Sequence, residues 1–552
     1  METTKLVYHV LAGVSLLILI SACSGKLASW INMPYLLLFL GVGMLAGSEG
    51  VGGVVFDNPQ AANFIGSVAM AFILLSGGFD TEWQSVRKVL SRGTLLSSLG
   101  VLLTALFVGV FAWGFLRLFD HEISLTWCFL LGAMVSSTDA AAVFTVLRGR
   151  SVSLRGDLRP LLEFESGSND PMAAFLTIFL LDIVMKEGRG VAASMSDYLQ
   201  ILPQFAIRMA VGVAVGWAIG WVAGRIVNRI NLEFDGLYYV LAVGVGLFAF
   251  SGAELAHGNG FMSVYVTGLV MGNHRFTLHN SIGRFYDGFA WLMQVVLFTM
   301  LGLLVFPSHV WQAKWAGLGV ALFLIFAARP LAVCLCLWRS GYTLKERLFV
   351  AWVGLRGGAP IMLATFPLMA GAPEAGLLFN IVFFIVILSI VLQGATIMPL
   401  ARWLGVDAPL SASPRAPLMF EHTGNMDGQT RNFTLPGDSP LAGCPLSRAG
   451  LPHGALVLLI RREGRFIPPN GSTVLRGGDE LMIIGPDAIL AATAAVLSGA
   501  GPAWDAVPAP EVKLPPPETI APSPIPAAVQ GAKEENAAAP AGMGGGAASG
   551  AN

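Results

Sequence analysis

Charged side chains are scarce in this sequence: Asp, Glu, Lys and Arg make up 12% of 552 residues, whereas hydrophobic residues make up 55%. Soluble domains carry about a quarter charged residues, so the shortage excludes an ordinary soluble protein. Runs of about twenty apolar residues recur over roughly the first 400 positions, as in chains with many membrane-spanning helices. The sequence therefore predicts an all-α polytopic membrane protein.

Cysteine is also rare, with five residues in the chain: Cys23, Cys128, Cys334, Cys336 and Cys444. No two have the spacing of a zinc site, and Cys334 and Cys336 face different sides of a helix. Neither Ser-His-Asp nor Cys-His groups gather in the apolar runs, as a hydrolytic enzyme would need. We expect reduced thiols, no metal cluster, no catalytic cofactor and no enzymatic activity.

Apolar windows locate the predicted spans. There are thirteen, near residues 6–22, 34–47, 61–79, 94–116, 124–147, 161–183, 201–225, 236–254, 259–273, 286–306, 315–338, 347–369 and 378–401. The first window ends in ILISACSG, which could pass for a lipoprotein cleavage site. Because the charged leader is weak and many spans follow, we interpret this window as the first transmembrane helix.

Lysine and arginine separate into two sets of alternate loops. One set holds about sixteen of them, and the other about four, namely Arg117, Lys186, Arg189 and Lys314. The positive-inside rule makes the richer set cytoplasmic. The protein is then predicted to cross the inner (cytoplasmic) membrane, with its N-terminus outside and its C-terminal part inside.

The composition changes after the last span. We predict a transmembrane domain over 1–402, a Pro-rich linker over 403–417 and a small α+β domain over 418–498, where ALVLLIRREG and GDELMIIG are strand-like. Residues 499–552 are rich in Ala, Pro and Gly, which cannot form a packed core, and we expect them to be disordered.

Polar residues interrupt the apolar spans at a few positions. They are Thr138 and Asp139, the stretch EFESGSNDPM at 163–172, Arg329 and Arg356. Ionisable groups within a membrane cost several kcal/mol each, so they indicate function by default. Ser166, Asn169 and Asp170 stand at i, i+3 and i+4, so one helix face presents a hydroxyl, an amide oxygen and a carboxylate to a cation.

Two spans carry signals for interrupted helices. GLRGGAP, beginning at Gly354, holds three glycines and a proline, which a membrane helix tolerates only beside a cavity. SSTDAA, beginning at Ser136, holds short hydroxyl side chains that compete for backbone groups. They fall in the fifth and twelfth spans, where an inverted repeat would place a matching pair around a central site.

The buried carboxylate suggests an exchange mechanism. Asp170 can hold a proton or a cation, but each disfavours the other. If the site opens alternately to the two sides, this competition couples the two ions in opposite directions. Other interpretations remain open nearby: Glu165 with Arg329 or Arg356 could be a structural ion pair, and Asp139 could cap a helix.

These motifs resemble the NhaP-type branch of the monovalent cation:proton antiporters, and most closely the CvrA-like potassium/proton antiporters with a TrkA-C tail. The matching segments are Thr138-Asp139, ESGSND at 165–170, HGNGFMSVYVTGLVMGN at 257–273, ARP at 328–330 and GLRGG at 354–358. The resemblance implies thirteen helices with an inverted repeat, a dimerisation domain, and a core domain that moves in an elevator-like manner.

The resemblance also implies roles for single residues. Asp170 would bind the cation and the proton, with Ser166, Asp139 and the backbone of Thr138 nearby. Asn169 before Asp170, in place of a second aspartate, is similar to the electroneutral members.

Three further residues take structural roles by the same resemblance. Arg329 would pair with Glu165, and Arg356 would steady the broken twelfth helix. Asn169 would tie the sixth helix to the broken fifth near Thr138.

The C-terminal part resembles a TrkA-C (RCK-C) domain over about 418–498. Such domains form dimers and bind regulatory ligands, sometimes nucleotides, but no ligand residue is identifiable in this sequence. The companion GxGxxG subdomain is not recognisable. The Ala/Pro-rich tail departs from the longer CvrA proteins, which carry another folded module there.

Taken together, the sequence predicts a homodimeric transporter that exchanges K⁺, or possibly Na⁺, for protons in cation, pH and volume homeostasis, without nucleic acid as a partner. A cation channel gated by the C-terminal domain is one alternative, but it would need a filter such as TVGYG, which does not occur. A sodium-coupled symporter is another, and it would need a cavity for an organic substrate.

Overall fold

The computed structural model describes residue 8 and residues 13–23, 35–119, 123–139, 143–144, 147, 152–190, 194–230, 232–274, 276, 278–409, 429–437, 439–463 and 465–497. The chain divides into two compact units between Thr430 and Arg431. The predicted tail, 499–552, and the linker residues 410–417 lie outside the described residues.

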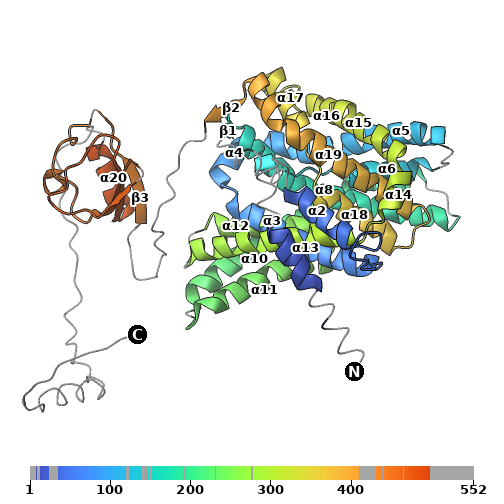
Figure 1. Ribbon diagram of the computed structural model, residues 1–552, viewed down its shortest axis with the longest axis horizontal. Coiled ribbons are helices and arrows are strands. Elements are labelled where there is room, and N and C mark those ends of the chain that lie inside the picture. Colours follow the sequence, from blue (N-terminus) through green and yellow to red (C-terminus); the bar gives the residue numbers. More distant parts are fainter. Residues whose placement is uncertain are drawn as a thin grey trace, which may run out of the picture. The chain divides into compact units, whose positions relative to one another are not determined.

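In its described residues the first unit consists mainly of helices, together with one short strand pair (Figure 1). Its first elements are α2 (Tyr35–Ala46), α3 (Pro59–Asp80), α4 (Trp83–Leu95), η1 (Leu96–Gly100), α5 (Val101–Leu116), η2 (Arg117–Phe119), α6 (Leu125–Met134), α8 (Leu158–Gly188), α9 (Met195–Leu199) and α10 (Ile201–Arg229). There follow α11 (Asp235–Leu255), α12 (Gly260–Gly272), α13 (His279–Leu303), α14 (Pro307–Gln312), α15 (Lys314–Phe323), η3 (Leu324–Ala328), α16 (Arg329–Cys336), α17 (Leu344–Trp352), α18 (Gly358–Met369) and α19 (Ala375–Leu404). β1 (Val152–Leu154) pairs antiparallel with β2 (Asp407–Pro409).

Eight helices of the described part are long and apolar enough to cross a membrane. They are Pro59–Asp80, Trp83–Leu116, Leu158–Gly188, Met195–Arg229, Asp235–Leu255, His279–Leu303, Lys314–Cys336 and Ala375–Leu404. The other five predicted windows overlap the shorter apolar helices Gly13–Cys23, Tyr35–Ala46, Leu125–Met134, Gly260–Gly272 and Gly358–Met369. The protein is therefore a multi-pass, mostly helical membrane protein, and the total of thirteen spans stays a prediction.

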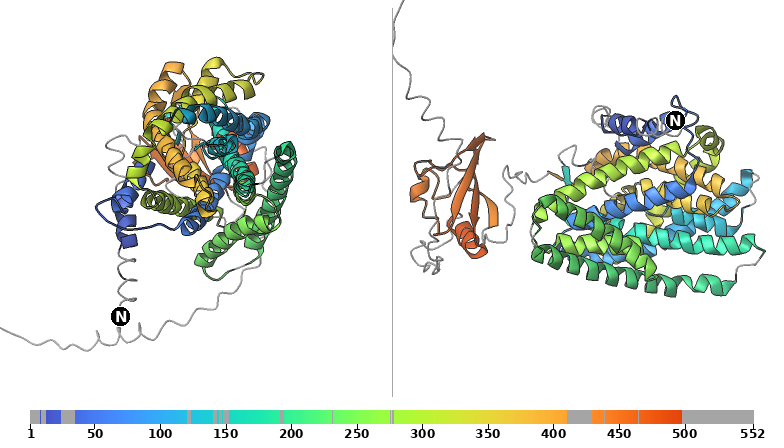
Figure 2. Two further views of the ribbon diagram at one scale, coloured as in Figure 1. Left: turned by 90° about the vertical axis from the view of Figure 1, so that its right-hand side faces the viewer. Right: turned by 90° about the horizontal axis from the view of Figure 1, so that it is seen from below.

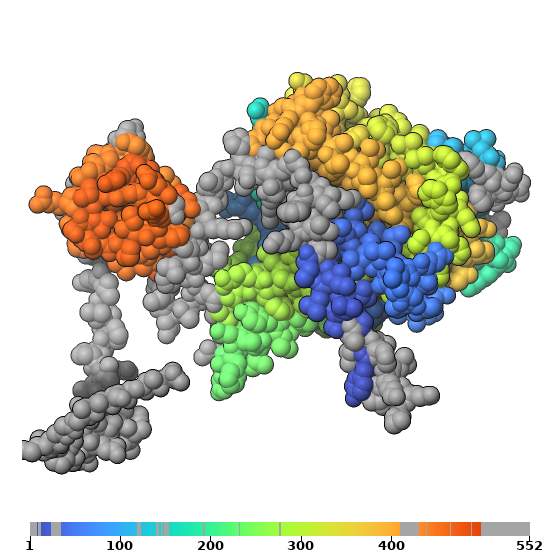
Figure 3. All heavy atoms as spheres, viewed as in Figure 1, coloured from blue at the N-terminus to red at the C-terminus, as the bar shows by residue number. Residues whose placement is uncertain are grey.

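The helices form two packed groups. In one, α3 packs on α12 and α13, and α10 packs on α11 and α12; a separate apolar cluster fills the space between them. In the other, α8 packs against α4 and α6, and α19 packs against α15 and α18. We call these groups the α13 half and the α8 half. Figures 1, 2 and 3 show α10–α12 and α15–α19 on opposite sides of this unit.

Glycine makes the close packing of the α13 half possible. A Cβ atom added to Gly78 on α3 would come within 2.3 Å of the Tyr265 carbonyl oxygen on α12. One added to Gly268 on α12 would come equally close to the Leu75 carbonyl oxygen. Small residues therefore let the α3 and α12 backbones approach each other, which is how membrane helices associate without a hydrophobic driving force.

The second unit is a small α+β domain. Its four-stranded sheet has the order β3-β6-β4-β5, from β3 (Gln429–Thr434), β4 (Leu456–Arg462), β5 (Arg465–Ile467) and β6 (Glu480–Gly485). β4 runs antiparallel to both β5 and β6, and η4 (Leu446–Arg448) and α20 (Asp487–Leu497) complete the unit. Its core contains Ile460, Leu481 and Leu490. The strand-like runs seen in the sequence are therefore strands.

Candidate ion-binding site

Two non-helical segments meet within the first unit. α6 ends at Met134 and residues 135–139 are not helical; α17 ends at Trp352, and helical structure resumes only at Gly358 in α18. The Asp139 N–H donates to the Leu355 carbonyl oxygen at 2.7 Å. Each segment thus uses the other to satisfy a backbone group that its own helix has left free.

Arg356 lies at this crossing and compensates the end of α6. Its Nη1 donates to the carbonyl oxygens of Ser136 at 2.8 Å and Ser137 at 2.5 Å. These carbonyls lie just beyond the last residue of α6, so the guanidinium is a donor to the segment and a positive charge beside the negative end of the helix dipole. This contact satisfies Nη1 of an arginine that is 1% exposed, whereas its Nη2 is buried without a hydrogen-bond partner.

α19 holds the Arg356 backbone from the other side. The Arg356 N–H donates to Ser389 Oγ at 3.0 Å, Ser389 donates to Gln393 Oε1, and the Gln393 amide donates to the Trp352 carbonyl oxygen at 2.7 Å. The last residue of α17 and the interruption after it are therefore fixed by one helix. Ser389 and Gln393 were not predicted as site residues, because each is a single polar residue in an apolar run and its partner lies elsewhere in the sequence.

Gly357 is required by a close approach. A Cβ atom at this position would lie 2.1 Å from Asp139 Oδ2. Any larger residue would displace either the carboxylate or the loop that holds it. Glycine in GLRGG therefore brings the second interruption up against the Asp139 side chain.

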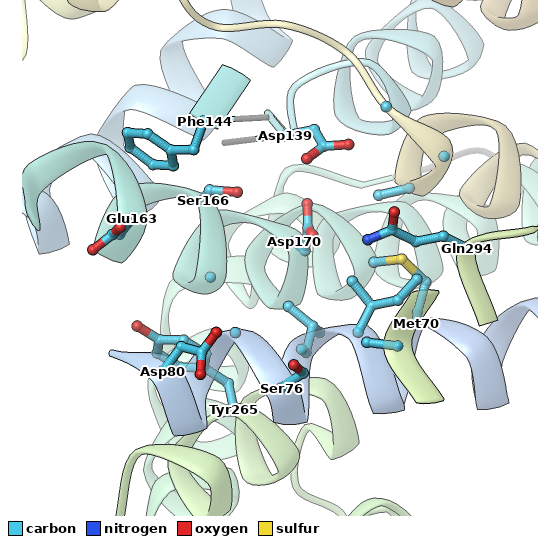
Figure 4. A pocket seen from close by; sticks show the side chains of 18 of the residues that line it. Met70, Ser76, Asp80, Asp139, Phe144, Glu163, Ser166, Asp170, Tyr265 and Gln294 are labelled. Atoms are coloured by element: carbon cyan, nitrogen blue, oxygen red, sulfur yellow. The ribbon is translucent and has the colours of Figure 1, made fainter. Parts of the chain in front are cut away.

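α8 supplies the polar face predicted from the sequence. Ser166 Oγ donates to the Thr138 carbonyl oxygen at 2.8 Å, and the Asn169 amide donates to Thr138 Oγ1 at 2.5 Å. Asp170 follows directly, and its Oδ1 is buried with no hydrogen-bond partner. Both Asp139 and Asp170 line one cavity of about 260 Å³, and Figure 4 shows their carboxylates facing it.

Glu165 points elsewhere on the same helix. It forms a buried ion pair with Arg329, the first residue of α16, and both side chains are at most 3% exposed. The structure therefore brings together Thr138, Asp139, Ser166, Asn169 and Asp170 around the cavity, Arg356 behind it, and Glu165 with Arg329 to one side.

The far wall of the cavity comes from the α13 half. It includes Ser76 and Asp80 on α3, Tyr265 on α12, and Asp287 and Gln294 on α13. Ser76 donates to Asp287 at 3.1 Å. These residues were not predicted from the sequence, although Ser76, Tyr265, Asp287 and Gln294 are polar side chains within the predicted spans 61–79, 259–273 and 286–306, and Asp80 directly follows the first of these spans.

A second cavity of about 710 Å³ adjoins the first. Five residues line both: Asp80, Thr81, Arg159, Glu163 and Asp287. The second cavity also reaches Glu82 and Arg284. The two cavities together form a polar route that leads to Asp170, and the carboxylates of Asp80, Glu163 and Asp287 line both of them.

Two contacts join the halves beside Asp170. The Asn259 amide, at the N-terminus of α12, donates to the Pro171 carbonyl oxygen at 2.9 Å. The Tyr265 ring lies against Gly167, where an added Cβ would be 2.3 Å from a ring carbon. The α8 turn that carries Asp170 therefore rests directly on α12.

The donor set suits a hard, monovalent cation. Carboxylate, hydroxyl, amide and backbone oxygens surround the cavity, and such oxygens replace the water shell of alkali ions. In the described part of the chain no three His, Cys, Asp or Glu side chains form a group that could hold a resident metal. The site can instead carry a cation or a proton reversibly at a carboxylate.

Comparison with known families identifies the first unit. The family model described as "Sodium/hydrogen exchanger, transmembrane" matches residues 15–403, which is more than half of the chain. The chain belongs to this family. A second family model, described as the TrkA-C domain, matches residues 431–498.

Relatives of this exchanger-family chain include proteins named as potassium antiporters. A protein named K(+)/H(+) antiporter NhaP from Alkalimonas amylolytica is 37% identical over 85% of this chain and 80% of its own length. K(+)/H(+) antiporter NhaP2 from Shewanella oneidensis is 38% identical over 88% and 83%. A protein named Na(+)/H(+) antiporter NhaP from Pseudomonas aeruginosa is 28% identical over 62% and 82%.

A solved structure shares the fold of this exchanger-family chain. The sodium proton antiporter MjNhaP1 from Methanocaldococcus jannaschii aligns with a TM-score of 0.59 and 23% sequence identity, over 72% of this chain and all of the other. The NhaP-type recognition made from the sequence motifs, with a TrkA-C domain, is therefore confirmed.

Proposed function

We propose that the protein exchanges a monovalent cation for protons across the membrane, and that Asp170 binds both ions in turn. The observation that carries this proposal is the Asp170 carboxylate, with Oδ1 buried and unpaired in a polar cavity that also holds Asp139. A buried carboxylate without a protein partner has its charge balanced either by a proton or by a bound cation.

Competition at Asp170 couples the two ions. A cation at the carboxylate repels a proton, and a bound proton removes the charge that attracts the cation. Ser166, Asp139 and the Thr138 backbone surround Asp170 as further cation ligands. Because neither ion leaves unless the other replaces it, alternate exposure of the site gives exchange without a current of one ion alone.

K⁺ is the favoured cation. The relatives with 37–38% identity over more than four fifths of both chains are named potassium/proton antiporters, whereas the sodium/proton relative is 28% identical. Exchange is electroneutral in this proposal. Asn169 cannot titrate and its amide is engaged with Thr138, and Glu165 is neutralised by Arg329, so neither neighbour on α8 competes with Asp170 as the exchanging group.

The proposed topology follows the charge distribution. The protein lies in the inner membrane as a homodimer of thirteen-span subunits, with its N-terminus outside and the C-terminal domain inside. The segments 135–139 and 353–357 are the interruptions of a pair of broken helices in the fifth and twelfth spans. The α8 half moves against the α13 half in an elevator-like manner.

The remaining segments have regulatory or connecting roles in this proposal. Residues 1–402 transport ions, 403–417 link, and 418–498 form the TrkA-C domain, which binds a regulatory ligand such as a nucleotide. Residues 499–552 form a disordered tail. Organic cofactors take no part in the exchange.

The test is proton flux in proteoliposomes that contain the purified protein. K⁺, Na⁺, Rb⁺ and Li⁺ are added in turn to acid-loaded vesicles, and lumenal pH is followed. We expect cation-dependent alkalinisation, strongest with K⁺ and unchanged by clamping the membrane voltage. A single-channel current, or uptake of a labelled metabolite with Na⁺, would contradict the proposal in favour of a channel or a symporter.

A further inference from the structure

One face of α13 lines the cavity that contains Asp170. The residues concerned are Asp287, Ala290, Trp291, Gln294, Leu297 and Phe298. Their spacing of i, i+3, i+4, i+7, i+10 and i+11 is that of a single helix face. Two of the six, Asp287 and Gln294, are polar, and polar side chains inside a membrane are costly unless they have a use.

Gln294 stands across the cavity from Asp170. Figure 4 shows its amide on the Asp170 side of α13, with the NH₂ group towards the Asp170 carboxylate on α8 and the oxygen turned away from it. The two residues belong to different halves of the molecule. Gln294 therefore adds to the site a polar group that the α8 half does not contain.

The Gln294 amide is available for an ion. No hydrogen bond to the described part of the chain engages it. Gln393 offers a contrast within the same protein, because its amide oxygen accepts from Ser389 and its amide nitrogen donates to the Trp352 carbonyl. Gln393 has a structural role, and Gln294 lacks the contacts that would give it one.

Apolar side chains make up part of the cavity wall around Gln294. On the α3 and α13 side, the cavity wall near Asp170 includes Met70, Leu74, Leu297 and Phe298. Ser76 is on the same wall, but its hydroxyl donates to Asp287. A cation at Asp170 would have carboxylate and hydroxyl oxygens on the α8 side. On the far wall, which also carries Ser76, Asp80, Tyr265 and Asp287, Gln294 is a polar side chain directed at Asp170.

We propose that Gln294 coordinates the cation held by Asp170 through its side-chain oxygen, and that it thereby helps to select among monovalent cations. This inference rests on the proposed function and adds a ligand from the second half of the molecule. Selectivity between alkali ions depends on the number and dipole strength of neutral oxygen ligands, and an amide oxygen is such a ligand.

An amide also suits a site that must release its ion. It carries an oxygen acceptor and an NH₂ donor, so a half-turn about its last bond presents either group. The oxygen faces a bound cation, and the NH₂ group faces the ionised carboxylate after the cation has left. Gln294 changes no net charge, so it leaves the exchange ratio to Asp170.

Substitution of Gln294 tests the inference. Wild-type protein, Gln294→Leu and Gln294→Asn are reconstituted in proteoliposomes, and apparent KM values are measured for K⁺, Rb⁺, Na⁺ and Li⁺ at one pH. Loss of one contact to a charged group is worth about tenfold in affinity. We expect Gln294→Leu to raise the KM for the best cation about tenfold and to reduce the differences in KM among the four cations. The KM values of Gln294→Asn should lie between those of the wild type and Gln294→Leu.

A second measurement needs no transport. A cation that binds only the folded protein raises its melting temperature. Melting temperatures in detergent are compared between KCl and choline chloride at the same ionic strength. KCl should raise the melting temperature of the wild type and of the control Gln312→Leu, which replaces an exposed glutamine at the end of α14. Gln294→Leu should lose most of this shift. Wild-type KM ratios and a wild-type shift in this variant would overturn the inference.

A charged variant covers the case in which Gln294→Leu does not fold. Gln294→Glu keeps the length of the side chain and adds a carboxylate, so we expect a lower KM and a changed cation-to-proton ratio. Wild-type values for both would contradict the inference. If the wild type exchanges no cation for protons, the proposed function is wrong. If the wild type exchanges them and the Gln294 variants do so with the same KM values, only the inference about Gln294 is wrong.

Discussion

The Asn169 amide donates to Thr138 Oγ1 at 2.5 Å, which joins the middle of α8 to the non-helical segment after α6. Each of the two bonded residues is followed in the sequence by an aspartate, Thr138 by Asp139 and Asn169 by Asp170. One short hydrogen bond therefore sets the spacing of the two acidic side chains that face the cavity.

Replacing Asp170 should abolish exchange without unfolding the protein. Asp170→Asn removes the group that binds the proton and the cation, while Oδ1 has no hydrogen bond to lose. We expect cation-dependent proton flux in everted vesicles to fall to the level of empty vesicles. Size-exclusion chromatography of the purified variant should match the wild type. Exchange at an undiminished rate would exclude Asp170 as the carrier.

Breaking the Glu165–Arg329 pair should reduce stability more than it changes ion preference. Glu165→Gln leaves the Arg329 charge buried and unpaired, a change that costs about 3–5 kcal/mol. The melting temperature in detergent should fall accordingly, with the ranking of K⁺ and Na⁺ unchanged. The control is Lys186→Gln, which breaks an exposed pair with Asp197 worth at most about 1 kcal/mol. A shift in ion ranking for Glu165→Gln would argue against a structural role.

A single methyl group at Gly357 should disable the site. The Cβ atom of Gly357→Ala would lie 2.1 Å from Asp139 Oδ2, so the carboxylate or the crossing must move. We expect a loss of exchange of at least about tenfold, which corresponds to about 1.4 kcal/mol. Gly376→Ala on α19 is the matched control, because its Cβ would meet nothing within 4 Å. Equal flux from both variants would disprove the steric account.

The hydrogen bond from the Arg356 N–H to Ser389 on α19 should contribute measurably to the stability of the folded protein. Ser389→Ala removes the acceptor of the buried Arg356 N–H, and an unsatisfied buried donor costs about 1–3 kcal/mol. Thermal unfolding of the purified variant should report this loss. Ser251→Ala on α11 removes an exposed hydroxyl bound to its own helix and should have little effect. If the two serine variants melt together, Ser389 makes no such contribution.

The C-terminal domain should lose stability in acid through Asp479. Burial raises the pKa of Asp479, but hydrogen bonds from Arg462 and the Arg476 N–H outweigh burial, so its pKa lies below the ordinary value. The stabilisation is complete above the ordinary pKa of about 4 and is lost as pH falls through the lowered pKa. Hydrogen exchange of β4 and β6 in the intact protein should rise over that range. Asp479→Asn should exchange faster at neutral pH and lack this acid-dependent rise.

Local patterns were sufficient for much of the first unit. Apolar windows marked the long helices, and the i, i+3, i+4 spacing put Ser166, Asn169 and Asp170 on one face, two of them in contact with Thr138. Glycine density at 354–358 marked a stretch that is not helical until Gly358. These features depend on residues close in sequence, whose geometry a helix fixes.

Long-range partners could not be predicted in the same way. Gln294 and Asp287 acquire their positions from the packing of α13 against α3, more than 200 residues away in sequence, and Ser389 from the crossing that α19 covers. The π-helical turns at Leu96–Gly100 and Leu324–Ala328 also carry no sequence signature that we used. A lone polar residue in an apolar run indicates that a partner exists, but not which one.

α8 and α12 are joined by two contacts of different kinds, the packing of the Tyr265 ring on Gly167 and the Asn259–Pro171 hydrogen bond. Gly167 has no side chain to obstruct the Tyr265 ring if α8 is displaced along α12. The Asn259–Pro171 hydrogen bond, in contrast, has to break for such a displacement. In the proposed elevator-like movement of α8 along α12 this hydrogen bond would have to break, so we expect cooling to slow turnover more than it weakens ion binding.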